Sequence, residues 1–136
     1  LGIILSALSI KFLWNPIQMV GEVAISKQFV LVTLAFLVPL SDTTTVVINR
    51  LAKGQSPFVG GKDHTTHHLS YLGFSDRQVA LIVGIICSIN TLLIFYALTI
   101  KNWSGLFTFL FGGYAFLVFL SLFLITKRTT PKATKL

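Results

Sequence analysis

The sequence predicts an all-α membrane protein, a polytopic bundle of transmembrane helices that forms a single domain. Hydrophobic residues make up 54% of the 136 residues and charged residues only 11%, and the mean hydropathy is +0.82. Soluble domains carry about 25% charged residues, so a chain of this length is too apolar to be one. Long apolar runs also alternate with short polar segments, which is typical of a chain that crosses a membrane several times.

Four apolar runs are each expected to form a membrane-spanning helix. They lie at residues 1–14, 27–49, 79–100 and 105–126. The first is too short to cross a hydrocarbon core about 30 Å thick, so we expect the rest of that helix to lie upstream. The second contains Pro39, which should kink or break the helix near Val38 to Leu40 because proline has no backbone N–H to donate.

The positive charges predict which segments face the cytoplasm. A polar loop at 50–78 and a tail at 127–136 together hold eight Lys and Arg residues, whereas the rest of the chain holds three. Lys and Arg are enriched on the cytoplasmic side of membrane proteins, so we expect the loop and the C-terminus to be cytoplasmic. These cations are scattered singly and form no stripe along an exposed helix. The net charge of +7 therefore does not indicate a nucleic-acid partner.

All three histidines of the chain lie in this loop, at a spacing that is informative. His64, His67 and His68 stand at i, i+3 and i+4, which would bring them to one face of a helix. Asp63 is expected to cap that helix at its N-terminus. Imidazole N–H groups donate to oxygen-rich anions, so the cluster is suited to bind phosphate at a membrane surface.

Three further residues are expected to support this site. Arg50 and Lys62 would add positive charge beside the histidines and help to bind phosphate. Asp42 is an ionisable group at membrane depth, and such groups usually face a cavity or the bundle interior. It either caps a second, re-entrant or interfacial helix, with Thr43 to Thr45 in the first turn, or takes a direct part in the site.

The residues alone leave other functions open. Histidines at i and i+4 also have a zinc spacing, but this face lacks the Glu of an HExxH motif and the loop has no Cys. We therefore predict no metal ligand within these 136 residues. A non-enzymatic alternative is a transporter segment whose histidines bind a transition metal or relay protons, and a third is a purely structural anchor.

Several motifs in order along the chain carry a resemblance to a known family. They are the stretch Pro39-Leu40-Ser41-Asp42, then Arg50, then Gly54-Gln55-Ser56-Pro57-Phe58, then Asp63-His64-Thr65-Thr66-His67-His68-Leu69, and then Gly73-Phe74-Ser75. This set resembles the C-terminal part of the polyprenyl-phosphate N-acetylhexosamine-1-phosphate transferases, glycosyltransferase family 4. The family includes undecaprenyl-phosphate GlcNAc-1-phosphate transferase and phospho-N-acetylmuramoyl-pentapeptide transferase.

The resemblance implies an enzyme of cell-envelope glycan biosynthesis in the bacterial plasma membrane. It would transfer a sugar 1-phosphate from a UDP-N-acetylhexosamine to undecaprenyl phosphate or another polyprenyl phosphate, releasing UMP and requiring Mg²⁺. His64, His67 and His68 match the family's catalytic histidine motif, although many members have H-x-H-H where this chain has H-x-x-H-H. The sequence leaves open which hexosamine is carried and whether the protein forms a homodimer.

The acidic residues depart from the family pattern. The family has an adjacent aspartate pair and a later motif rich in Asn and Asp, whereas the four acids of this chain are never adjacent: Glu22, Asp42, Asp63 and Asp76. The magnesium ligands are therefore expected upstream. We expect the chain to be a C-terminal fragment that is inactive alone.

Overall fold

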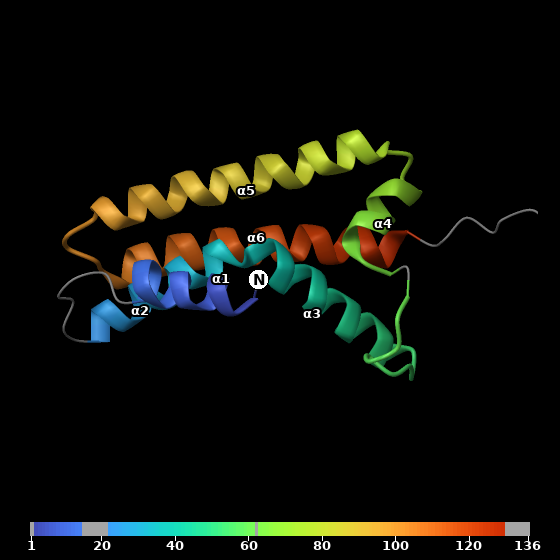
Figure 1. Ribbon diagram of the computed structural model, residues 1–136, viewed down its shortest axis with the longest axis horizontal. Coiled ribbons are helices and arrows are strands. Elements are labelled where there is room, and N and C mark those ends of the chain that lie inside the picture. Colours follow the sequence, from blue (N-terminus) through green and yellow to red (C-terminus); the bar gives the residue numbers. More distant parts are fainter. Residues whose placement is uncertain (1, 15–21, 62, 130–136) are drawn as a thin grey trace, which may run out of the picture. The chain divides into compact units, whose positions relative to one another are not determined.

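The computed structural model describes residues 2–14, 22–61 and 63–129, and every regular element in those residues is a helix (Figure 1). In chain order the elements are α1 (Gly2–Ser9), η1 (Ile10–Trp14, a π-helical turn), α2 (Glu22–Ala35), α3 (Leu37–Ala52), α4 (Thr65–Tyr71), α5 (Asp76–Thr99) and α6 (Gly105–Arg128). The all-α fold class predicted from composition is confirmed.

Two of these helices are long and apolar enough to cross a membrane. They are α5 and α6, each 24 residues long. The bent pair formed by α2 and α3 passes the same test when taken together, which raises the number of candidate spans to as many as three. The stretch Gly2–Trp14 is apolar but shorter than a span. The described residues therefore form a polytopic helical membrane segment.

The predicted break in the second apolar run is present, slightly earlier than expected. The helices Ile25–Ala35 and Leu37–Ala52 meet at an angle of 76°, and Phe36 between them is in a turn. Pro39 lies in the first turn of α3, where a missing N–H removes no helical hydrogen bond. The proline ring would clash with a turn placed before it, so the helix ends ahead of Pro39 and not at it.

The polar loop predicted at 50–78 contains more helix than its sequence suggested. Helix α3 continues to Ala52, α4 lies within the segment, and α5 begins at Asp76. A capping box fixes this last start: the Ser75 N–H donates to Gln78 Oε1 at 2.8 Å, and the Gln78 N–H donates to Ser75 Oγ at 3.4 Å. Two of the free N–H groups at the start of α5 are satisfied in this way.

The chain divides into two compact units. The first is Leu1–Leu37 with Ser88–Phe116, and the second is Val38–Cys87 with Leu117–Leu136. In the first unit, buried Lys27 donates from Nζ to the carbonyl oxygen of Ile100 at 2.7 Å and lies over the Trp103 ring. This contact fixes the turn that joins α5 to α6. The second unit holds all of the predicted site residues that the structure describes.

Candidate functional site

The centre of the candidate site is Asp42, which lies inside α3 and contacts the start of α4. Its Oδ2 is 2.8 Å from His64 Nδ1, and its Oδ1 accepts a hydrogen bond from the backbone N–H of Thr65 at 2.6 Å. Asp42 therefore caps α4 from another helix and orients His64 at the same time. The prediction that Asp42 begins a helix of its own, with Thr43 to Thr45 in the first turn, is wrong because α3 already runs through these residues.

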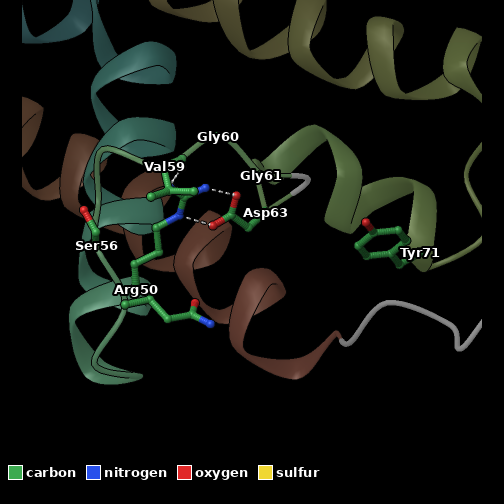
Figure 2. Close-up of a pocket in the computed structure, with 8 residues that line it drawn as sticks. Arg50, Ser56, Val59, Gly60, Gly61, Asp63 and Tyr71 are labelled. Atoms are coloured by element: carbon green, nitrogen blue, oxygen red, sulfur yellow. Dashed lines mark hydrogen bonds and ion pairs between the residues drawn. The ribbon is translucent and has the colours of Figure 1, made fainter.

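Asp63 does not cap α4, so that prediction is also wrong. The residue at the cap position is His64, whose side chain makes no capping hydrogen bond. Asp63 instead pairs with Arg50: Oδ2 is 2.5 Å from Arg50 Nε, and Oδ1 is 2.6 Å from Nη2 (Figure 2). These hydrogen bonds hold the pKa of the Asp63 carboxyl below its ordinary value. The stability that the pair contributes is therefore present near neutral pH and is lost as the pH falls through that lowered pKa.

The three histidines do not share one helical face. His64 precedes the helix and has an extended backbone, with φ −70° and ψ 152°. Only His67 and His68 lie within α4, and adjacent residues on a helix point about 100° apart. His64 and His67 are exposed, whereas His68 is buried. The three histidines do not form the predicted face because α4 begins at Thr65, one residue after His64.

His68 attaches α4 to the end of α6, which lies beside it in Figure 1. Its Nδ1 is 2.5 Å from Thr129 Oγ1, and that hydroxyl donates to the carbonyl oxygen of Ile125 at 2.7 Å. A hydroxyl has one proton, so Nδ1 must be the donor to Thr129 and the neutral ring keeps its lone pair on Nε2. Burial lowers the pKa of His68 below its ordinary value.

The titration of His68 can be measured in the membrane-embedded protein by NMR with ¹⁵N-labelled histidine. We expect His68 to take up its proton below a pH of about 6.5, the ordinary pKa of histidine, and to show the Nδ1–H tautomer above it. The unfolded chain would bind this proton first, so the native state should lose stability as the pH falls from about 6.5. His68→Gln identifies the resonance. An Nε2–H tautomer, or uptake above about 6.5, would contradict this assignment.

His67 lines a cavity of its own. The cavity is open and measures about 510 Å³. It is lined by the polar side chains of Thr66, Ser70 and Asp76 and by further residues of α5. A second, smaller cavity of about 150 Å³ adjoins Asp42 and Thr65, and the rest of its lining is almost wholly apolar, from Val38, Pro39, Thr66, Leu69, Ile82, Val83, Ile86 and Leu122. Thr66 and Val83 line both cavities, so the cavity of His67 lies next to a largely apolar space.

Two further sequence predictions concern Lys62 and metal binding. Lys62, predicted to bind phosphate beside Arg50, lies outside the described residues. Among residues 2–14, 22–61 and 63–129, no group of three or more His, Cys, Asp or Glu side chains is placed to hold a metal ion. The oxygens of Asp42 and Asp63 are bound by Thr65, His64 and Arg50.

Sequence reasoning missed two contacts that shape this site. Thr129, the partner of His68, lies 61 residues away along the chain, and nothing in the sequence around Thr129 indicates this hydrogen bond. The capping box of Ser75 and Gln78 was detectable, because serine followed three residues later by glutamine before an apolar run is typical of a helix start.

The fold and site define a helical membrane protein with a polar segment of histidine, aspartate and arginine beside candidate spans. Over 60 residues the chain is 35% identical to decaprenyl-phosphate N-acetylglucosaminephosphotransferase of Mycolicibacterium smegmatis (strain ATCC 700084 / mc(2)155). It is 33% identical over 60 residues to the protein of that name from Mycobacterium leprae (strain TN). This partial similarity confirms the resemblance to polyprenyl-phosphate N-acetylhexosamine-1-phosphate transferases.

The similarity covers a limited part of each protein. The aligned residues are 44% of this chain and 15% of the length of each relative. No protein-family model and no solved structure matches the chain.

Proposed function

We propose that this chain is the C-terminal part of a membrane transferase that moves N-acetylhexosamine 1-phosphate from a UDP-sugar to a polyprenyl phosphate. The observation that carries the proposal is the partial similarity to decaprenyl-phosphate N-acetylglucosaminephosphotransferases, whose name describes this type of reaction. The proposed setting is cell-envelope glycan synthesis in the bacterial plasma membrane, with the 50–78 loop and the C-terminus in the cytoplasm.

The proposed reaction joins two phosphates. An oxygen of the lipid phosphate attacks the β-phosphorus of the UDP-sugar, and a new P–O–P bond forms. The bond from that phosphorus to the oxygen bridging it to the α-phosphate breaks, and UMP leaves with the electron pair. Because several negative charges meet in this step, catalysis depends mainly on neutralising and aligning phosphates.

We assign phosphate handling to the three histidines, in different ways. Asp42 orients His64 through Nδ1, which leaves Nε2 to meet the substrate, as an acceptor in the neutral ring and as a donor to a phosphate oxygen in the imidazolium form. Exposed His67 would act from the opening of its own cavity. Buried His68 would act through its contact with Thr129, which fixes α4 and therefore the other two.

The apolar cavity beside Asp42 suits the lipid substrate. Its lining is apolar except for Asp42 and the threonines of α4. A prenyl chain needs an apolar surface that ends near a group able to handle its phosphate. At about 150 Å³, the cavity has room for only part of such a chain.

The described residues do not fit a magnesium site. Mg²⁺ prefers carboxylate and water oxygens in an octahedral arrangement. Asp42 and Asp63 each have both carboxylate oxygens bound by protein donors, and no acidic pair is present in the sequence. We therefore propose that any magnesium ligands lie outside these 136 residues, and we derive no step through the ion.

The proposed function can be tested by UMP release from the full-length transferase, of which this chain is the proposed C-terminal part, in nanodiscs. We expect UMP to form from UDP-N-acetylglucosamine, or from another UDP-N-acetylhexosamine, only when a polyprenyl phosphate is present. A polyprenyl alcohol of the same length is the control, since it lacks the attacking phosphate. Release of UMP at the same rate with the alcohol, or no release with any of these sugars, would contradict the proposal.

A further inference from the structure

The guanidinium group of Arg50 is surrounded by acceptors from its own chain. Nε and Nη2 donate to the two oxygens of Asp63, at 2.5 and 2.6 Å. Nη1 donates to the carbonyl oxygens of Pro57 and Val59. These contacts use four of the five N–H groups that an arginine offers.

The position of Arg50 also limits what else it can bind. Its side chain is only 8% exposed, although an open cavity of about 630 Å³ lies beside it. Its charge is offset by a carboxylate in two-point contact, the geometry that favours arginine over lysine. Little of this guanidinium remains for a substrate phosphate.

Gly61 is packed against the pair. A Cβ added to Gly61 would lie 2.5 Å from Arg50 Nη2 and 2.7 Å from Asp63 Oδ1, whereas one added to Gly60 would meet nothing within 4 Å. A flexible arginine tip can usually move aside, but here both of these atoms are joined by a hydrogen bond. A methyl group at position 61 should therefore push the pair apart.

The Arg50–Asp63 pair and Asp42 attach the same short segment, residues 63–65, to helix α3. Arg50 holds Asp63, while Asp42 holds His64 and Thr65. Arg50 and Asp42 both belong to α3, about two turns apart. Residues 63–65 are therefore held by two residues of α3. The 54–61 loop contacts the Arg50 side chain through the carbonyl groups of Pro57 and Val59.

We propose that Arg50 and Asp63 form a clamp that closes the 54–61 loop and positions His64, so that Arg50 is a positioning residue and not a ligand of substrate phosphate. The effect on His64 matters for catalysis only if the proposed function is correct. The clamp itself can be tested without any activity, so failure of one proposal can be told from failure of the other.

Deuterium exchange of the native protein in nanodiscs tests the clamp directly. We expect Arg50→Ala, Asp63→Asn and Gly61→Ala each to raise deuterium uptake by the 54–61 backbone at least several-fold, because the loop loses its attachment to α3. Gly60→Ala is the matched control and should leave uptake unchanged. Wild-type protection in Arg50→Ala and Asp63→Asn would overturn the proposal.

Kinetics then separate positioning from phosphate binding. Arg50→Ala, Asp63→Asn and the double variant should each lower kcat by about 10- to 100-fold, with losses that do not add, because each breaks the same contact. Arg50→Lys should not rescue kcat, since an ammonium group cannot make the two-point contact. A phosphate ligand would behave differently: Arg50→Ala would raise KM, Asp63→Asn would leave KM unchanged or lower it, and Arg50→Lys would restore binding. That pattern would refute the clamp.

Discussion

Replacing Asp42 with alanine is expected to lower the rate of sugar 1-phosphate transfer by about 100-fold or more. One carboxylate both accepts the Thr65 N–H and holds His64 Nδ1, so the substitution removes two constraints together. Loss of a helix cap costs about 1 kcal/mol of stability, whereas a misplacement of about 1 Å at a reacting group can cost about 100-fold in rate. The main effect should therefore be on kcat.

Asp42→Asn separates the two roles. The amide oxygen can still accept the Thr65 N–H, so α4 should stay capped, but the charge beside His64 is lost. We expect this variant to keep wild-type deuterium uptake at residues 65–71 and still transfer about 10-fold more slowly. Thr43→Ala, at the exposed neighbouring position on α3, controls for damage to the helix. Full activity in Asp42→Ala would show that Asp42 has no part in catalysis.

Replacing His64 with alanine should have an effect of similar size, about 100-fold or more in kcat. The ring is held by Asp42 at Nδ1, so its Nε2 is the atom left to meet substrate. Hydrogen bonds from a positioned donor to an anion are worth most where the donor needs no rearrangement. His64→Ala should therefore reduce kcat much more than it raises KM.

Two isosteric variants locate the atom of His64 that acts. Asparagine places its amide nitrogen near the position of Nδ1, and glutamine places its own near Nε2. We expect His64→Gln to recover part of the lost kcat and His64→Asn to recover none, even though asparagine can still reach Asp42. Recovery by asparagine alone would mean that the Asp42 contact matters for folding and that His64 does not meet the substrate.

The helices were largely predictable because their signals are local. The apolar runs that predict spans correspond to α5, α6 and the bent pair of α2 and α3, and Pro39 predicted the break to within a few residues. Backbone sterics decide where a proline ends a helix, so no distant contact was needed. The start of α5 was predicted too late because the capping box of Ser75 and Gln78 was not used in the prediction.

The arrangement of the site was harder to predict because distant partners decide it. Asp63 has the residue type and position of a helix cap, yet Arg50 binds both of its oxygens and Asp42 takes the capping role from α3. Likewise, the histidine spacing predicts one face only if the helix includes His64. Local propensity cannot show which of two competing carboxylates reaches an N–H group.

The most direct measurement is transfer from UDP-N-acetylglucosamine labelled with ³²P at the β-phosphate, using the full-length transferase that contains this chain, in nanodiscs with a polyprenyl phosphate. If the protein transfers a sugar 1-phosphate, the label must move with the sugar into the lipid product, and the released nucleotide must be unlabelled UMP. If the label instead remains with the nucleotide as UDP, the protein transfers the sugar alone, and the central claim of phosphate-to-phosphate transfer is wrong.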